Sequence, residues 1–347
     1  MKVANNTNQF PVITISGEPF ERGRQHGAQL KLKIAKTIDF YRSIFKLPES
    51  EIMRYAEFFQ QLIDSFNTGY IAEMRGIAEG AKVDPLWIVA LNARTEILSR
   101  STNAGNECTT VYFPQSSILG QNWDWGKALE PLTVLMKIEQ SDGHEILMLT
   151  EPGIIGKIGM NNRSLGVCLN ILTQDEELDG LPVHIILRAI LDCKSLAEVE
   201  ALLDRHADGK ASNIMVADAS GKGFDIEFCG ADSYRLKPHS DYLLHTNHYL
   251  AQSINSEHNP DFSSSYARFN KATEVLASNI ARAARAMHEL LSDDSDPVWP
   301  VYRDYRPDES VHELGTIFTV VMELAHGKMH VRKGKGPNAR FFEYRLT

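Results

Sequence analysis

Residues 103–125 read NAGNECTTVYFPQSSILGQNWDW, and this stretch decides the architecture because the character of the chain changes within it. The preceding residues, 20–100, are predicted to be mostly helical, since apolar side chains recur there at helical spacing. The turn-rich NAGNE, residues 103–107, has no such period, and short strand-like runs follow it. The stretch therefore marks the passage from a helical segment into a sheet.

The rest of the chain alternates between helices and strands. Helices are predicted near 183–191 and from Ser195, where Ser195-Leu-Ala-Glu198 forms a capping box, and again near 265–276 and 281–291. This order of helices, sheet, helices and sheet predicts an α+β domain in which helices cover stacked antiparallel sheets. The predicted strands are 109–113, 117–123, 133–138, 146–150, 154–160, 165–171, 213–218, 224–228, 242–245, 316–323, 328–331 and 341–345.

Length and composition limit the classes of function. The 347 residues suffice for one large domain or two ordinary ones, and no internal repeat or low-complexity linker divides them. A net charge of −9 argues against binding of nucleic acid and against a polybasic membrane anchor, because both require basic surfaces. No stretch approaches ~18 continuous apolar residues and the first ten residues lack a signal pattern, so we expect a cytoplasmic protein without a membrane span.

No motif in the chain indicates a cofactor or a metal. The glycines of GIIGKIG, residues 153–159, do not match G-x-G-x-x-G, and neither a Walker lysine motif nor H-E-x-x-H is present. His326 and His330 are four residues apart, but the surrounding sequence predicts a hairpin, so we interpret them as two surface histidines. The four cysteines form no C-x-x-C pair. We therefore expect no cofactor and no metal site.

Cys108 differs in its setting from the other three cysteines. Cys168, Cys193 and Cys229 lie in or beside apolar or strand-like runs and are interpreted as small buried hydrophobes. Cys108 follows a turn-rich stretch at the start of a strand, where a structural cysteine is one interpretation. A nucleophile is the other, because a cysteine that becomes an N-terminus has an α-amine of pKa about 7.7–8.0 as its own base. That state requires the Cys108 thiol to attack the carbonyl of Glu107.

Motifs along nearly the whole chain resemble those of the acyl-coenzyme A:6-aminopenicillanic acid acyltransferases and the related C45 peptidases, which include β-alanyl-amine hydrolases. GQNWDW, from Gly120 to Trp125, is the most specific of them, since two tryptophans bracket an aspartate after Gly-Gln-Asn. The other resembling segments are GEPFERGRQHGAQL from Gly17, CTT from Cys108, NRSLGVCLNIL from Asn162, SNIMVADASG from Ser212, HTNHY from His245 and the terminal GTIFTVVMELAHGKMHVRKGKGPN from Gly315.

The resemblance implies a four-layer αββα fold of the N-terminal-nucleophile hydrolases and self-cleavage before Cys108. Residues 1–107 would form a helical α chain and residues 108–347 the αββα body, or β chain, and the two would stay associated as one compact domain. Where the family's penicillin enzyme carries glycine before the cysteine, this chain has Glu107. A side chain restricts the backbone at the scissile bond, so cleavage could be slower or follow a different geometry.

The resemblance also assigns supporting roles around Cys108. The hydroxyl of Thr110 would support the cleavage site, Asp124 would orient or assist the cysteine, and Asn247 would donate its side-chain amide to the oxyanion. Structural interpretations of the same residues are a strand threonine, a turn or cap aspartate and an Asx turn. Electrostatic support would come from Arg268 with Ser264 or Ser265, although an arginine near the start of a helix also suits a surface ion pair.

Three functions compete for this chain. The leading hypothesis is an amidase or acyltransferase that forms an acyl-enzyme on Cys108 from a small N-acyl amide or acyl thioester. An uncut, non-catalytic binding or structural protein is the alternative, favoured by Glu107. A papain-like pair of Cys108 with His245 or His248 lacks the flanking C-G-[SA]-C-[WY] pattern, so we interpret both histidines as packing or pocket residues.

Two further features leave the partners of the chain open. The acidic run TQDEELDG, residues 173–180, is interpreted as a solvated loop, although it would favour a cationic amine if it bordered the pocket. The sequence does not fix the oligomeric state, and a homo-oligomer is one option.

Overall fold

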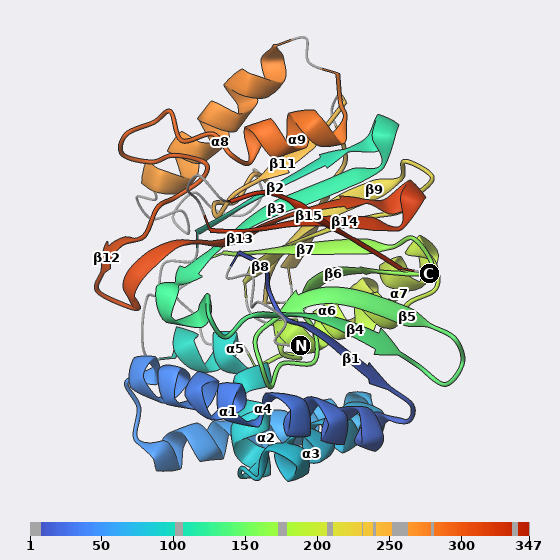
Figure 1. Cartoon of the computed structure of the whole chain (residues 1–347), viewed down its shortest axis with the longest axis vertical. Coiled ribbons are helices and arrows are strands. Elements are labelled where there is room, and N and C mark those ends of the chain that lie inside the picture. Colours follow the sequence, from blue (N-terminus) through green and yellow to red (C-terminus); the bar gives the residue numbers. More distant parts are fainter. Residues whose placement is uncertain are drawn as a thin grey trace, which may run out of the picture.

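The computed structural model describes residues 8–100, 107–172, 179–206, 211–230, 232–238, 241–251, 263–278, 281–334 and 339–346. Its first part is helical, as predicted, and the helices gather at one end of the molecule (Figure 1). In α2, Ile52, Ala56, Phe59 and Ile63 are buried at intervals of three and four residues, which is the pattern of an amphipathic helix. These helices are α1 (Pro19–Phe45), α2 (Glu49–Phe66), α3 (Thr68–Ala81), α4 (Pro85–Asn92) and α5 (Arg94–Ser99).

Glycines allow α1 and α3 to approach each other closely. A Cβ atom at Gly23 would lie 1.9 Å from the backbone oxygen of Glu73, and one at Gly76 would lie 2.1 Å from that of Phe20. Any larger residue at these positions would force the two helices apart. The motif that begins at Gly17 is therefore partly a packing motif.

Within the described residues, seven strands form the sheet that carries Cys108. They run in the order β11-β2-β3-β13-β14-β15, with β12 paired to β13. All the pairings are antiparallel, and β2 follows directly on the turn-rich stretch of the sequence. The strands are β2 (Glu107–Phe113), β3 (Ile118–Gly126), β11 (Leu243–His245), β12 (Arg306–Asp308), β13 (His312–Glu323), β14 (Lys328–Lys333) and β15 (Phe342–Arg345).

The second sheet has eight described strands in the order β1-β4-β5-β6-β7-β8-β9-β10. Its pairings are antiparallel except that β1 lies parallel to β4, an exception to the predicted antiparallel sheets. The strands are β1 (Val12–Ser16), β4 (Val134–Glu139), β5 (Glu145–Thr150), β6 (Ile158–Asn161), β7 (Gly166–Ile171), β8 (Ser212–Ala217), β9 (Gly223–Cys229) and β10 (Asp232–Leu236).

The two sheets stack between helices, so the fold is the predicted four-layer αββα sandwich (Figure 1). The seven-stranded sheet is covered by α8 (Ser263–Ala277) and α9 (Ala284–Leu290), and α6 (Val183–Asp192) packs on β6 and β7 of the other sheet beside α7 (Leu196–His206). Side chains of β2 and β3 reach β7 across the interface, as when Gln121 donates to the backbone oxygen of Leu169 at 2.5 Å. None of the described helices is long and apolar enough to cross a membrane.

Some predicted boundaries were wrong. The strand predicted over 154–160 begins only at Ile158, because the chain turns at residues 152–153, where Gly153 has a φ of +100°, and is irregular up to residue 157. Strands β1, β10 and β12 were not predicted, and the last helix begins at Ala284 rather than at residue 281. The Ser195 hydroxyl accepts from the backbone N–H of Glu198, so the cap is confirmed, but the Glu198 carboxylate returns to the N–H of Lys194 rather than that of Ser195. His326 and His330 belong to a hairpin, as predicted.

Candidate active site

Cys108 lies one residue inside the start of β2, the second strand of its sheet. Its register partner on β3 is Trp123, and its side chain is 3% exposed. Residues alternate between the faces of a strand, so Cys108 shares a face with Thr110. The Thr110 hydroxyl donates to Asn170 Oδ1 on β7 at 2.7 Å, which shows that this face points toward the second sheet.

Two side chains from distant parts of the sequence converge on the backbone of Cys108. Asn247 Oδ1 accepts from the Cys108 N–H at 2.7 Å, and the guanidinium of Arg268 donates to the Cys108 carbonyl at 2.5 Å. Arg268 also donates to Asn247 Oδ1 at 3.0 Å and to the Thr109 hydroxyl at 3.0 Å. Arg268 is fully buried, so its interpretation as a surface ion-pair residue was wrong.

The two candidate serines have different partners. Ser264 accepts from Arg268 Nε at 3.3 Å, whereas the Ser265 hydroxyl accepts from the backbone N–H of Asn247 at 2.7 Å. Both serines lie in the first turn of α8, so this helix positions Arg268 and the Asn247 segment together. The side-chain amide of Asn247 donates to the Ile171 carbonyl at 3.0 Å in the uncut chain.

Asp124 lies on the opposite face of β3, toward the helices. Its neighbour on that face, Asn122, donates to the carbonyl oxygens of Leu291 and Val301 at 2.9 Å. Asp124 is 1% exposed, and among the described residues its carboxylate has no ion-pair partner; a neighbouring polar side chain is the hydroxyl of Thr316, its register partner on β13. Burial raises the pKa of Asp124 to about 7, against the opposing charge of Arg268.

The thiol of Cys108 is protonated in the uncut chain at neutral pH. Burial and then the charge of Asp124 raise the pKa of the Cys108 thiol to about 11, although the backbone N–H of Asp124 and the charges of Arg268 and Lys157 work against this rise. Among the described residues, neither His245 nor His248 bonds to the thiol, because their rings bind Glu227 and Ser265 respectively. The papain-like arrangement therefore has no support in the geometry.

Sequence reasoning overlooked three polar residues between the sheets. Asn170 binds Thr110, and the ammonium of Lys157 lies 3.6 Å from the ring centroid of Trp123 while paired with Glu151. Burial lowers the pKa of Lys157 to about 7, against the charge of Glu151. A lysine inside the apolar run GIIGKIG could have indicated a buried charge from the sequence. The third residue, Glu227, lies on β9, where Asp225 and Glu227 alternate with apolar residues.

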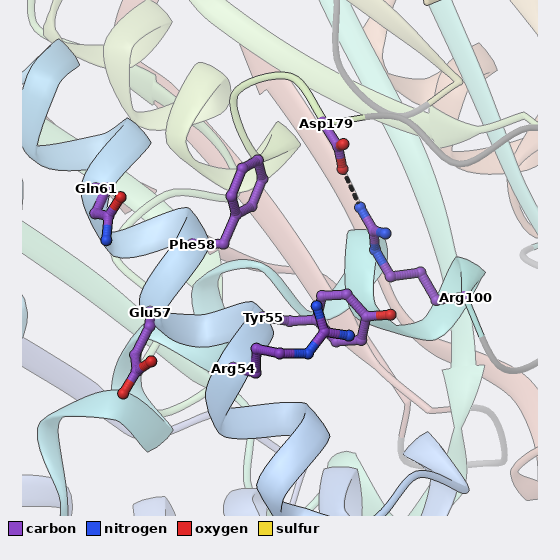
Figure 2. A pocket seen from close by; sticks show the side chains of 7 residues that line it. All are labelled: Arg54, Tyr55, Glu57, Phe58, Gln61, Arg100 and Asp179. Carbon is purple, nitrogen blue, oxygen red and sulfur yellow. Dashed lines mark hydrogen bonds and ion pairs between the residues drawn. The ribbon is translucent and has the colours of Figure 1, made fainter.

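A pocket of about 350 Å³ lies on α2, away from the site residues (Figure 2). Arg100 and Arg54 contribute its positive charges, and Glu57 and Asp179 contribute an equal number of negative ones. Arg100 pairs with Asp179, a described residue of the acidic run, while residues 173–178 lie outside the described residues. The pocket gathers none of the predicted catalytic side chains, and no described cluster of three or more His, Cys, Asp or Glu residues could hold a metal ion.

A family model and a curated relative match most of this chain. Residues 113–338 match the family model described as acyl-coenzyme A:6-aminopenicillanic acid acyl-transferase. The chain is 31% identical over 341 residues to the acyl-coenzyme A:6-aminopenicillanic-acid-acyltransferase 40 kDa form of Emericella nidulans, which covers 94% of this chain and 93% of that protein. Among solved structures, a Caenorhabditis elegans N-acylethanolamine-hydrolyzing acid amidase ortholog aligns with a TM-score of 0.46 at 17% identity, covering 70% of this chain and 100% of that chain.

Proposed function

The chain belongs to the acyl-coenzyme A:6-aminopenicillanic acid acyltransferase family, and from this premise we propose that it is a self-processing enzyme whose nucleophile is Cys108. Its substrates would be small N-acyl amides or acyl thioesters. The observation that carries the proposal is the convergence of Asn247 and Arg268 on the backbone of Cys108. These side chains come from two separate segments, the loop after β11 and helix α8, and contact the residue that would become the new N-terminus.

In the proposed cleavage, Cys108 Sγ attacks the carbonyl carbon of Glu107. A C–S bond forms, the C–N bond between the two residues breaks, and the nitrogen takes up a proton to become the α-amine of Cys108. Water then hydrolyses the thioester, which frees the carboxylate of Glu107 and the thiol. The nitrogen of the scissile bond is the atom that Asn247 Oδ1 contacts at 2.7 Å, so the leaving group is held before the reaction.

Cleavage would supply the base that the uncut site lacks. The buried thiol, with a pKa of about 11, is a weak nucleophile until a base takes its proton. An α-amine of pKa about 7.7–8.0 on the same residue can do so near neutral pH. The thiolate would then attack the substrate carbonyl, and Asn247 with backbone N–H groups would stabilise the oxyanion. Water or an amine would resolve the acyl-enzyme, by hydrolysis or by acyl transfer.

Residues 1–107 and 108–347 would remain together after cleavage. Glu73, on the proposed α chain, binds Arg188 of the proposed β chain at 2.9 Å, and Arg94 binds Glu151 at 3.2 Å. All four side chains are buried, so separating the two pieces would expose unpaired charges that are now compensated.

Trapping the acyl-enzyme tests the proposal. Cleaved protein is incubated with short N-acyl 4-nitroanilides and quenched in acid. Mass spectrometry then measures the mass of the N-terminal peptide of the β chain. We expect the mass of one acyl group on the peptide that begins with Cys108. Cys108→Ala should stay uncut and form no adduct, whereas Cys168→Ala, which removes another buried thiol, should form it. Turnover that persists in Cys108→Ala would contradict the proposal.

A further inference from the structure

Glu227 has no role in the proposed reaction, yet it binds the segment that carries Asn247. It lies on β9 of the second sheet, and its side chain is fully buried. Its carboxylate accepts from the backbone N–H groups of Leu250 at 2.6 Å and Ala251 at 3.0 Å, and from His245 Nε2 at 2.7 Å. The three donors lie on both sides of Asn247 in the sequence.

Both ring nitrogens of His245 face oxygen atoms of neighbouring groups. Its Nε2 faces Glu227, and its Nδ1 lies 2.8 Å from the carbonyl oxygen of Thr246 and 3.4 Å from Asn170 Nδ2. The oxygens of Glu227 and Thr246 favour a proton on each ring nitrogen, whereas the Asn170 amide nitrogen near Nδ1 is itself a donor. Burial opposes this charge, but the carboxylates of Asp225 and Glu227 raise the pKa of His245.

Glu227 in turn is held as a carboxylate. Burial favours its neutral form, but the bond from His245 and the two backbone N–H donors hold the pKa of Glu227 below its ordinary value. His245 and Glu227 thus form an ion pair between the two sheets, with both side chains fully buried.

We propose that Glu227 and His245 form a clamp that positions Asn247 at the backbone of Cys108, an inference that rests on the proposed function of that cysteine. Ser265 holds the backbone of Asn247 from the helix side, and the clamp fixes the same segment from the side of the second sheet. Within the described residues, neither member of the pair bonds to Cys108, so both are positioning residues. An ion pair that only joined the sheets would not need to bind the backbone beyond Asn247.

Amide exchange tests the clamp without relying on activity. In a Cys108→Ala background, which keeps the chain uncut, the amide hydrogen of residue 108 is bonded to Asn247 Oδ1. Adding Glu227→Gln should speed exchange of that amide roughly as much as adding Asn247→Ala does, because both remove the same protection. Adding Glu73→Gln, which disrupts a different buried ion pair, should leave that amide as slow as in the parent. Unchanged exchange in folded Glu227→Gln protein would overturn the proposal.

A double-mutant comparison adds a kinetic readout with short N-acyl 4-nitroanilides. Glu227→Gln should lower kcat by up to ~100-fold with KM unchanged, because the displaced group acts in the transition state. In an Asn247→Ala background, the same substitution should change kcat by less than about twofold, since its effect passes through Asn247. Equal losses in both backgrounds would overturn the clamp.

Two controls separate the possible failures. If Glu227→Gln does not fold, Glu227→Asp keeps the charge with a shorter reach and should give the same pattern with smaller losses. If wild-type protein shows no acylation of Cys108, the proposed function fails, and amide exchange alone then decides the clamp.

Discussion

Two buried charged regions of this chain differ in how completely their carboxylates are paired. Glu73, on α3, accepts from Arg22 at 2.9 Å and from Arg188 at 2.9 and 3.0 Å, so both of its oxygens have guanidinium partners. Asp124, on β3, is equally buried, yet neither of its oxygens has an ion-pair partner among the described residues. The paired region joins α1, α3 and α6, and the carboxylate of Asp124 lies one register position from Cys108 on the other face of its sheet.

The difference in pairing distinguishes the Glu73 region, which is structural, from the Asp124 region, which is a candidate for reactivity. Burial alone would raise the pKa of both acids. The two arginines hold the pKa of Glu73 below its ordinary value, whereas the pKa of Asp124 stays raised at about 7. A buried carboxylate without an ion-pair partner destabilises the fold, and such costs concentrate where function requires them. Buried charge is therefore a weak marker of a site, and missing pairing beside a nucleophile is a stronger one.

Among Asn247→Ala, Asp124→Asn and Glu73→Gln, the substitution Asn247→Ala should lower turnover the most. The side chain would donate to the oxyanion in the transition state, so kcat should fall by roughly 10²–10³ with little change in KM, in protein already cleaved before Cys108. Steady-state kinetics on N-acyl 4-nitroanilides measures both constants. Asn247→Asp should be worse, because an ionised carboxylate repels the oxyanion. A rise in KM alone would instead make Asn247 a substrate-binding group.

Asp124→Asn should raise the melting temperature at pH 8 by a few degrees while lowering turnover. The pKa of Asp124 rises from 3.8 to about 7 on folding, so wild-type protein loses stability as the pH increases from about 4 to about 7. Asparagine cannot ionise, so the gain in melting temperature should grow across this window and level off above it. Scanning calorimetry measures the melting temperatures. A gain in melting temperature that does not depend on pH would mean that ionisation of Asp124 does not cause the loss of stability.

Glu73→Gln should have the smallest effect on turnover and a large effect on stability. Removing the charge leaves Arg22 and Arg188 buried without their full partner, at a cost of about 3–5 kcal/mol. Denaturant unfolding should show that loss, while kcat per folded molecule stays at the wild-type value. A fall in kcat comparable to that of Asn247→Ala would erase the distinction between the two regions.

Much of this fold could be predicted because local patterns match the elements. The helical period of α2 and the Ser195 cap depend only on neighbouring residues. The strands β10 and β12 were missed because they are short and mostly polar, and β1 because a five-residue strand gives little periodic signal. The parallel β1–β4 pair depends on contacts more than a hundred residues apart, which no local pattern encodes.

Residues of the candidate site could be predicted only where they lie in a motif that resembles the family's. Cys108, Asn247 and Arg268 were singled out by resemblance, and the structure brings them together. Glu227 was missed for a physical reason: alternating acidic and apolar residues, as in Asp225 to Glu227, ordinarily predict a strand with one solvent-facing side. In this sandwich that acidic side faces the other sheet, so the charges lie between two layers.

The most direct test of the central claim is the N-terminal sequence of purified protein after incubation. We predict two pieces, residues 1–107 and 108–347, with Edman degradation of the larger beginning Cys-Thr-Thr. Intact-mass analysis of the same sample gives the fraction cut, and Cys108→Ala provides the uncut reference. A correctly folded sample that remains a single chain after prolonged incubation would contradict the claim that Cys108 becomes an N-terminal nucleophile.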